Sequence, residues 1–432
     1  MSDSSITLPD STLASPPARE AVRIIEQLRR SGFVAVLAGG CVRDALLGRT
    51  PKDFDVATDA TPDSVREVFG KRNTLAFGAS FGVIGVLPPR RSQDDSSGSA
   101  AVLREPTEVA TFRADGNYSD GRRPDSVTFG DAQADALRRD FTINGMFYDP
   151  LAGKVLDYVG GLQDLREKHL RTIGDAVRRF DEDKLRMLRA VRFVTTLDLT
   201  MQPQTLAAIQ EHAGTIGVVS GERIGAEMQR VVAHHFGHRG LKWLVTSGLH
   251  RFVWPGAETM DWERLQTRYA RMDLLTFETG MATSLLTLHD SIAAATEDLR
   301  RLGNNWKLST AHLRAIQTAV STAEQLVDCE TMPWSRLQPL LIDRDISTTL
   351  NVAKAIADPE TKAGVDRAEH ELGRTDRPLD PPPLVTGNDL IQRGITPGPH
   401  FREWLSHLRQ AQLDGEISTF DEAIQWINRQ DS

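Results

Sequence analysis

The sequence predicts an α+β fold, in which an α/β unit near the N-terminus is followed by helices through the rest of the chain. From Val22 to Asp157, helix-like and strand-like segments alternate, as in a sheet covered by helices. After about residue 160, strand signals nearly vanish and amphipathic helical patterns continue to the end. At 432 residues the chain exceeds the length that one hydrophobic core usually serves. The Pro-rich stretch 376–385 is the clearest linker between the expected domains.

The α/β unit begins with short strands whose ends are set by glycine. The apolar, β-branched run 33–37 predicts a buried strand that ends at the pair Gly39 and Gly40. Apolar residues after the glycines would hold a short helix against the sheet. A second strand is expected to start near Phe54.

Further elements of this unit follow from capping residues and alternation. Thr61 is a capping residue followed by proline, so a helix is expected to begin there and to end at Gly70. Two more strands are predicted at 83–87 and 108–112, joined by the polar surface loop 88–101.

Composition excludes a protein that coats nucleic acid through its whole surface, because the net charge is -8. The arginines are nevertheless clustered, and a local basic groove for RNA is compatible with this charge. The clusters lie at Arg122 and Arg123, Arg138 and Arg139, Arg178 and Arg179, and Arg186, Arg189 and Arg192.

Cysteine usage and hydropathy predict a cytoplasmic protein. Cys41 and Cys329 are far apart and outside any metal-ligand spacing, so neither a disulfide framework nor a zinc site is expected. No apolar run approaches membrane-spanning length, so we expect no membrane contact. Residues 1–20 lack the features of a signal peptide and are expected to be a disordered tail.

The stretch 39–55 carries the strongest functional signal. Gly39 and Gly40 would let backbone N–H groups approach a phosphate, and Arg43 would add a fixed positive fork for its oxygens. Asp53 and Asp55 would point the same way on a strand and could bind hard divalent cations. Each motif alone is usually a turn or a solvated strand end. Together they favour metal-dependent phosphoryl transfer.

Glu108 stands at the start of the strand predicted at 108–112. On a neighbouring strand it would complete the metal site or act as a base for a 3′-hydroxyl. Taken alone, an exposed glutamate at a strand end is the more common case, so its role depends on Asp53 and Asp55 being catalytic.

Residues 138–146, with the sequence RRDFTINGM, combine charge with apolar residues that would pack inward. Arg139 could reach a triphosphate, and Asp140 could accept a hydrogen bond from a ribose hydroxyl, which would favour ribonucleotides. An ordinary structural ion pair is the alternative.

Residues 180–193 predict a helix on which charged residues recur at every third position while Leu185 and Leu188 face a core. Adenine and cytosine both present an amine donor beside a ring nitrogen acceptor. Asp183 and Arg186 could therefore read either base and reject guanine and uracil. A salt-bridged, solvated helix face is the alternative, disfavoured because few acids lie near the arginines in sequence. The charged ridge consists of Asp183, Arg186, Arg189 and Arg192.

Five stretches resemble, in order, the successive motifs of the class II tRNA nucleotidyltransferases, the bacterial family of CCA-adding enzymes and poly(A) polymerases. They span residues 33–230. The resemblance implies a nucleotidyltransferase head with a small mixed β-sheet, followed by all-α neck, body and tail domains. The stretches are LAGGCVRDALLG with KDFDVAT, EVATFRADGNYSDGRRPDSV, RRDFTINGM, EDKLRMLRAVRF and GERIGAE.

The resemblance also implies Mg²⁺ binding by Asp53 and Asp55, which with Glu108 form the expected catalytic set. The expected domains are a disordered tail at 1–20, the catalytic head at 21–160, a nucleotide-selecting neck at 161–235, a body at 236–375, and a linker with an RNA-binding tail at 376–432.

The nucleotide site implied by the resemblance combines a triphosphate pocket around Gly40, Arg43 and Arg139 with the reading helix at 180–193. The full expected nucleotide-binding set is Gly39, Gly40, Arg43, Asp44, Arg139, Asp140, Asn144, Asp183, Arg186, Arg189 and Arg192.

Two segments bear on which member of the family the chain resembles. The irregular stretch 113–126 matches the flexible loop of CCA-adding and A-adding members, although a plain solvated connector has comparable weight. The C-terminal sequence STFDEAIQWINRQDS lacks the strongly basic character typical of poly(A) polymerases of the family. At position 145 the sequence has glycine where members of the family commonly have alanine.

The sequence therefore predicts a magnesium-dependent enzyme that adds CMP and AMP from CTP and ATP to the 3′ end of tRNA and releases pyrophosphate. The alternatives are an A-adding enzyme that finishes tRNA ending in CC, a poly(A) polymerase, and a catalytically silent RNA-binding protein. The last is disfavoured because every candidate catalytic carboxylate is present.

Overall fold

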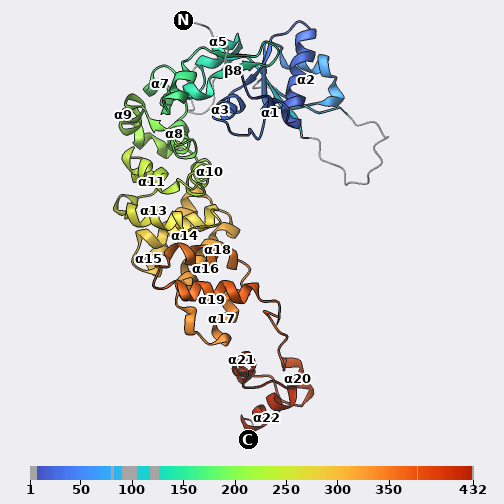
Figure 1. The fold of residues 1–432 in the computed structure, drawn as a ribbon, viewed down its shortest axis with the longest axis vertical. Coiled ribbons are helices and arrows are strands. Elements are labelled where there is room, and N and C mark those ends of the chain that lie inside the picture. The colour runs from blue at the N-terminus through green and yellow to red at the C-terminus, as the bar shows by residue number, and fades with distance from the viewer. Residues whose placement is uncertain (1–6, 79–81, 90–104, 117–125, 377, 431–432) are drawn as a thin grey trace. The chain divides into compact units, whose positions relative to one another are not determined.

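The structure is a computed structural model that describes residues 7–78, 82–89, 105–116, 126–376 and 378–430 (Figure 1). The chain divides into two compact units. Unit 1 contains residues 1–220 and 246–253, and unit 2 contains residues 221–245 and 254–432. The loop predicted at 88–101 and the central part of the stretch 113–126 lie largely outside the described residues.

Unit 1 is built on a seven-stranded mixed sheet with the strand order β3-β4-β5-β2-β1-β8-β9. The strands β2 and β5 are parallel, and the other neighbouring pairs are antiparallel. This confirms the predicted mixed sheet, and each predicted strand begins within two residues of its expected start. The bounds are β1 Ala35–Ala38, β2 Asp55–Thr58, β3 Thr74–Gly78, β4 Val83–Val86, β5 Thr107–Thr111, β8 Met146–Asp149 and β9 Lys154–Asp157.

Three helices pack around the first strands of this sheet. The helix α4 (Pro62–Phe69) begins at the Thr61 cap and ends at Gly70, as predicted. The helix α3 (Gly40–Leu46) follows β1 directly. The helix α2 (Pro16–Arg30) packs its apolar face against β1, β2 and β5.

The tail expected at residues 1–20 is a wrong prediction for the part that the structure describes. The short helix α1 (Asp10–Leu13) precedes α2, and residues 16–20 already belong to α2. The reason is local, because Ser15 accepts a hydrogen bond from the amide of Ala18 and prolines occupy the first turn. Residues 1–6 lie outside the described residues.

The stretch 113–126 was expected to be irregular, but its described ends form strands. The strand β6 (Arg113–Asp115) pairs with β7 (Val127–Phe129) in an antiparallel hairpin.

The rest of unit 1 is helical, apart from a pair of two-residue parallel strands, β10 (His169–Leu170) and β11 (Thr200–Met201). These strands are a small departure from the all-α neck implied by the resemblance. The predicted inward packing of residues 138–146 is confirmed, since Phe141, Ile143 and Met146 are buried. The helices are α5 Ala132–Leu137, α6 Gly161–Arg166, α7 Ala176–Glu182, α8 Leu185–Thr196, α9 Pro203–His212 and α12 His250–Val253, with the 3₁₀ turn η3 at Thr142–Asn144.

Unit 2 is helical throughout its described part. The helix α16 packs against α14, α15, α18 and α19, and the last three helices enclose a separate apolar cluster that includes Leu390, Leu408 and Ile427. Ser335 on α17 donates to the Asp414 carboxylate through both its amide and its hydroxyl, which fastens this cluster to α17. The helices are α10 Gly221–Val232, α11 Gly237–Thr246, α13 Trp262–Ala270, α14 Phe277–Leu288, α15 Ile292–Trp306, α16 Thr310–Val327, α17 Trp334–Leu341, α18 Ile346–Ile356, α19 Lys362–Gly373, α20 Gly387–Gln392, α21 Pro399–Leu413 and α22 Phe420–Gln430.

Within the described residues, none of the helices combines the length and hydropathy that a membrane crossing requires.

Candidate active site

The end of β1 and the start of β2 bring the glycine pair beside the predicted catalytic carboxylates. Ala38, the last residue of β1, pairs with Asp55, the first residue of β2. The parallel register of β2 and β5 pairs Val56 with Val109, so Asp55 and Glu108 lie next to each other one residue earlier. The predicted placement of Glu108 on a neighbouring strand is therefore confirmed.

Gly39 occupies a position where any other residue would be strained. Its φ of 69° lies in the left-handed region, and an added Cβ would stand 2.7 Å from Nη1 of Arg139. Gly39 thus lets the predicted phosphate-binding turn pass directly against the Arg139 guanidinium. Gly40 follows as the first residue of α3.

The aspartates are not arranged as strand neighbours. Asp53 precedes the strand, because β2 begins only at Asp55, and the shared face of the two side chains stays a prediction. The two carboxylates still interact, since the negative charge of Asp53 contributes to a raised pKa of Asp55. Asp53 therefore acts on Asp55 from the irregular segment before β2.

The carboxylate of Asp55 is electrostatically crowded. Its pKa rises from 3.8 to about 6 because loss of hydration and the negative charges of Glu108 and Asp53 outweigh the opposing charge of Arg139. The residue remains accessible to solvent, so the surrounding protein withdraws water from the carboxylate without closing it off from a ligand.

The crowded carboxylates fit a divalent cation. Among the described residues, no ion pair reaches the carboxylate of Asp53, Asp55 or Glu108. A bound cation would remove the repulsion that raises the pKa of Asp55, and carboxylate oxygens are the ligands that hard cations prefer. The three side chains nonetheless lack the compact spacing of a preformed three-ligand site.

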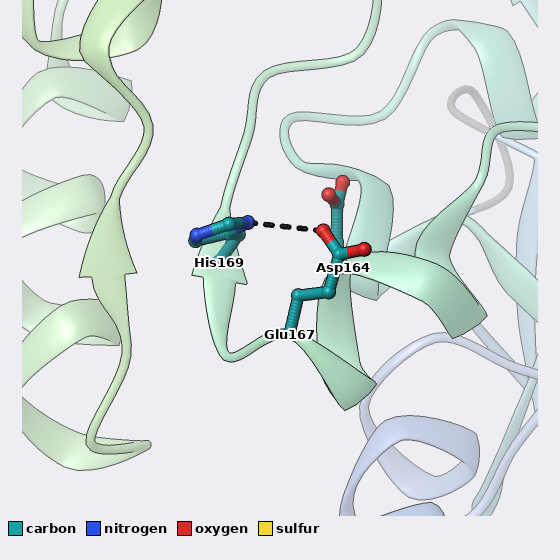
Figure 2. A group of neighbouring side chains, drawn as sticks. All are labelled: Asp164, Glu167 and His169. Carbon is teal, nitrogen blue, oxygen red and sulfur yellow. Dashed lines mark ion pairs between the residues drawn. The ribbon is translucent and has the colours of Figure 1, made fainter.

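One compact group of possible metal ligands does occur in the described part of the chain, and it consists of Asp164, Glu167 and His169 (Figure 2). Asp164 is buried and already accepts hydrogen bonds from Thr142 Oγ1 at 2.6 Å and from Arg171 Nε at 3.2 Å. His169 Nδ1 lies 3.3 Å from a Glu167 oxygen. Because Asp164 is already neutralised, this group is a weaker candidate for a cation than the carboxylates around β2.

Arg43 is held in place by two neighbours. Its Nε donates to Asp44 Oδ1 at 2.8 Å, and its Nη1 donates to Asn144 Oδ1 at 2.6 Å. The contact with Asn144 joins α3 to η3, which are far apart in sequence. Asp44 and Asn144, both in the predicted nucleotide-binding set, thus orient Arg43 in this structure.

Arg139 belongs to a buried ion-pair group that the sequence analysis missed. Both oxygens of the buried Asp135 carboxylate are used, one by Arg138 Nη2 at 2.6 Å and the other by Arg139 Nη2 at 2.8 Å. The two guanidinium groups hold the pKa of Asp135 below its usual range against the opposing effect of burial. Arg139 Nη1 also donates to the Asn144 carbonyl, beside the glycine turn.

Asp140 is saturated with hydrogen bonds. One oxygen accepts from the amide of Phe141 and from Asn144 Nδ2, and the other accepts from Nε and Nη2 of Arg189 at 2.8 and 2.6 Å. Burial would raise the pKa of Asp140, but Arg189 and Asn144 hold it at about 2. A ribose hydroxyl would have to replace one of these donors, so the structural ion pair weighed above is present here.

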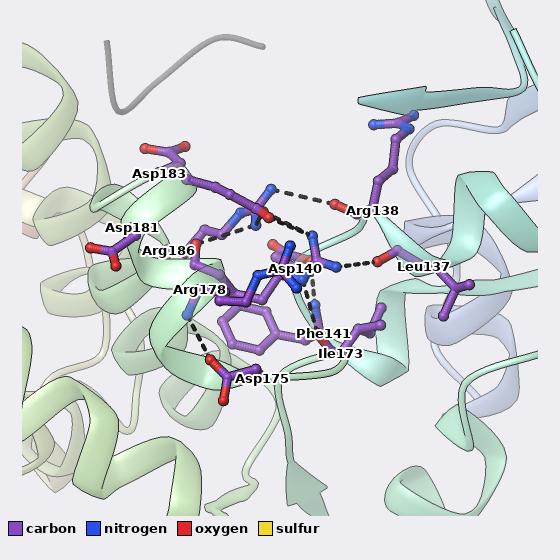
Figure 3. Close-up of polar contacts among 12 residues, drawn as sticks. Leu137, Arg138, Asp140, Phe141, Ile173, Asp175, Arg178, Asp181, Asp183 and Arg186 are labelled. Atoms are coloured by element: carbon purple, nitrogen blue, oxygen red, sulfur yellow. Dashed lines mark hydrogen bonds and ion pairs between the residues drawn. The ribbon is translucent and has the colours of Figure 1, made fainter. Parts of the chain in front are cut away.

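The charged ridge at 180–193 is split between two elements. Asp183 is the residue that ends α7, and α8 begins at Leu185, so the prediction of one continuous helix is wrong. The Asp183 carboxylate projects from this junction and accepts from the amide of Leu185 (Figure 3). Local capping by Asp183 explains why the helix breaks at that point.

Arg186 is turned toward protein groups. It is only 9% exposed, and its Nη1 donates to Glu182 Oε2 at 2.6 Å. Arg189 pairs with Asp140 as described above. The expectation that few acids lie near these arginines in sequence is therefore wrong for Arg186, whereas Arg189 pairs with an acid that is distant in sequence.

The ring of Phe193 on α8 contacts arginines from both the predicted triphosphate site and the charged ridge. The guanidinium carbons of Arg43, Arg189 and Arg192 lie 5.2, 5.4 and 4.3 Å from the centre of its ring. Such cation–π contacts stabilise charged groups that share one apolar support. Phe193 therefore brings Arg43 of the predicted triphosphate site together with two arginines of the charged ridge.

Sequence reasoning missed two acids that hold arginines of this site, Asp135 and Glu182, and it gave no role to Arg179, which holds Glu182. Asp135 precedes Arg138 and Arg139 by three and four residues, and Glu182 precedes Arg186 by four. Helical spacing was the signal that could have identified both acids.

A mixed sheet that carries crowded carboxylates beside a glycine turn and fixed arginines defines a nucleotidyltransferase head. Models of known families match the chain in the same order. The poly A polymerase head domain matches residues 35–171, a probable RNA and SrmB-binding site of polymerase A matches 198–260, and a putative tRNA nucleotidyltransferase domain 2 matches 279–427.

The chain belongs to the class II family of CCA-adding enzymes and poly(A) polymerases. It is 38% identical to a CCA-adding enzyme of Geobacillus stearothermophilus, over 95% of this chain and 96% of that one. A CCA-adding enzyme of Levilactobacillus brevis is 32% identical, over 93% and 94% of the two chains. Nucleotidyltransferases of this kind typically use a divalent metal.

Solved structures agree with this assignment. A Bacillus stearothermophilus CCA-adding enzyme in complex with CTP superposes with a TM-score of 0.73 at 27% identity, covering 96% of this chain and 99% of that one. A Thermotoga maritima CCA-adding enzyme complexed with tRNA shares the fold, with a TM-score of 0.66 at 18% identity and 99% of each chain covered.

Proposed function

We propose that this chain adds CMP and AMP from CTP and ATP to the 3′ end of tRNA and releases pyrophosphate. Its similarity to enzymes named as CCA-adding extends over nearly the full length of both chains, and this observation carries the proposal. The terminal 3′-hydroxyl would attack the α-phosphorus, the bond to the β-phosphate oxygen would break, and the hydroxyl proton would leave to a base.

Asp53 and Asp55 would hold Mg²⁺, for which their crowded charges are suited. The ion would lower the pKa of the terminal hydroxyl and offset the charge of the leaving pyrophosphate. Glu108, which lies beside Asp55, would strengthen the negative field at this position or accept the hydroxyl proton.

The arginines would bind and orient the nucleotide. Arg43, fixed by Asp44 and Asn144, and Arg139, fixed by Asp135, would face the triphosphate beside the glycine turn. Because both side chains are already oriented by neighbours, little conformational entropy would be lost when the nucleotide binds.

Base selection would belong to the junction of α7 and α8. Asp183 would accept the exocyclic amine of cytosine or adenine, and Arg186 would donate to the adjacent ring nitrogen. Guanine and uracil present the reverse order of donor and acceptor there, and would leave buried polar groups unpaired. Arg189 and Arg192 would support this junction from α8.

The domains expected from the sequence are retained as part of the proposal. They are the head at 21–160, the neck at 161–235, the body at 236–375, and the linker with the RNA-binding tail at 376–432. The cytoplasmic location stays a prediction.

Four tRNA substrates test the proposal, namely tRNA that lacks its end and tRNA that ends in C, CC or CCA, each incubated with single NTPs. The proposal expects C on the first two and a single A on the third, with no growth of the fourth. Addition restricted to the CC-ended substrate would identify an A-adding enzyme, and long A tails would identify a poly(A) polymerase. A complete lack of addition would favour the silent RNA-binding protein.

A further inference from the structure

We propose that Arg179 is a positioning residue that sets base specificity by holding Glu182 against Arg186. This inference rests on the proposed function, because it assigns to Arg186 the reading of the base. Arg179 lies in α7, outside the charged ridge, and would not itself touch the nucleotide.

Arg179 donates hydrogen bonds from all three nitrogens of its guanidinium group. Its Nη2 donates to the Leu137 carbonyl at 2.7 Å, and its Nε donates to the Ile173 carbonyl at 2.9 Å. Its Nη1 donates to both oxygens of Glu182, at 2.8 and 3.1 Å. The two carbonyl contacts fix Arg179 to backbone, so its third contact holds the Glu182 carboxylate at a fixed position.

Glu182 passes this position on to Arg186. Its Oε2 atom accepts from Nη1 of both arginines, at 2.8 Å from Arg179 and 2.6 Å from Arg186. The side chains of Arg179, Glu182 and Arg186 are only 20%, 18% and 11% exposed, so water competes weakly for these bonds. A carboxylate between two guanidinium groups has little freedom to rotate.

Arg186 is thereby held with part of its donor set unused. Its Nη1 is engaged by Glu182 and by the Arg179 carbonyl, and its Nη2 donates to the Arg138 carbonyl at 3.4 Å. The described contacts do not use its Nε–H. This group, with the second hydrogen of Nη2, is the donor edge that would meet the ring nitrogen of cytosine or adenine.

A lysine at position 179 would keep the positive charge but lose the planar fork. One ammonium group cannot reach both carbonyls and both oxygens of Glu182 with this geometry. Glu182 and Arg186 could then rotate together, and the reading edge would lose its fixed direction. Discrimination between bases should fall while the phosphate-binding residues stay in place.

The test compares Arg179→Lys and Arg179→Gln with Arg178→Lys and Arg178→Gln as matched controls. Arg178 is the next residue in α7, and its side chain is exposed. For each variant, kcat/KM is measured for CTP and UTP on tRNA that lacks its end, together with the thermal unfolding temperature. Binding of CTP and UTP without tRNA is measured by fluorescence titration.

The proposal expects Arg179→Lys to lower the ratio of kcat/KM for CTP over UTP at least about tenfold, with kcat for CTP reduced less. Glu182→Gln should give the same loss, and the double variant no greater loss than either single one. The Arg178 variants should keep the wild-type ratio. A ratio within twofold of wild type in Arg179→Lys, or an equal fall for CTP and UTP, would overturn the proposal.

The binding arm separates this inference from the proposed function. If the wild-type protein adds no nucleotide to any tRNA, the proposed function fails. The ratio of CTP to UTP affinity in Arg179→Lys still decides whether Arg179 sets base preference. If Arg179→Gln does not fold, Arg179→Lys with its retained charge provides the measurement.

Discussion

Two groups of carboxylates in unit 1 are treated in opposite ways by the fold. At the start of β2, Asp55 is crowded by the negative charges of Glu108 and Asp53, and its pKa rises to about 6. In the segment before η3, Asp140 is buried yet has a pKa of about 2, because Arg189 of α8 and Asn144 bind it.

The difference separates two uses of the same side chain. Carboxylates that are already neutralised by arginine serve to orient those arginines, and Asp135, Asp140 and Glu182 belong to this group. Among the described residues, the crowded carboxylates form no ion pair, and the charge of Arg139 only partly offsets their repulsion, which a bound cation would relieve. In the proposed function, the first region would receive the metal and the second would hold the nucleotide-binding groups still.

The largest effect is expected when a crowded carboxylate at the start of β2 is removed. Asp55→Asn should lower the single-turnover rate of CTP addition by about 10³-fold, which corresponds to about 4 kcal/mol of transition-state stabilisation. The unfolding temperature should stay equal or rise, because a repulsive charge is lost. Activity within tenfold of wild type would contradict the role of Asp55.

The arginine-bound carboxylates should behave in the opposite way, because the loss of a charge there should lower stability. Arg189→Met leaves the buried Asp140 without its ion-pair partner, and the free energy of unfolding at pH 7 should fall by about 3 kcal/mol. Urea unfolding measures this loss. Arg300→Met, which removes a surface pair with Glu297, is the matched control and should change stability little.

The pH dependence of stability should have opposite signs in the two groups. Asp140 stabilises the fold above the pKa of about 4 that it has when unfolded, and this contribution is lost as the pH falls toward 2. Asp55 has a raised pKa, so its contribution is lost as the pH rises from about 4 to 6. Unfolding of wild type, Arg189→Met and Asp55→Asn is measured across this pH range. If the contributions of Asp140 and Asp55 change with pH in the same direction, the distinction between the two groups of carboxylates is refuted.

A smaller effect should follow from Glu108→Gln. Of the two negative charges that raise the pKa of Asp55, that of Glu108 has the larger effect. Its removal should therefore bring that pKa down toward 3.8. An NMR titration of the Asp55 carboxyl group measures the shift. If the pKa of Asp55 stays at about 6, loss of hydration, and not the charge of Glu108, accounts for the raised pKa.

Features that depend on local sequence were predictable. The helix α4 starts at Thr61 and ends at Gly70 because capping and glycine conformation act within a few residues. The same local signal was available at Ser15, where the serine and the following prolines start α2, but the polar composition suggested a tail. The break at Asp183 was also local, yet the regular spacing of the arginines concealed it.

Features that depend on distant residues were not predictable from one sequence. The bond between Arg43 and Asn144 joins residues about a hundred positions apart, and the pairing of Arg189 with Asp140 joins α8 to the segment before η3. The sequence motifs and the resemblance placed all four residues in the expected site. They could not show that these residues would use one another as partners, because that depends on how α3, η3 and α8 pack.

Binding of Mn²⁺, measured by electron paramagnetic resonance in the presence of CTP, tests most directly whether the carboxylates around β2 receive the cation. Mn²⁺ prefers the same oxygen ligands as Mg²⁺. The double variant Asp53→Asn/Asp55→Asn should lose the bound signal, and Glu167→Gln/His169→Gln, which disrupts the compact group formed with Asp164, should keep it. Loss of binding in the second variant with retention in the first would contradict the placement of the cation at the carboxylates around β2.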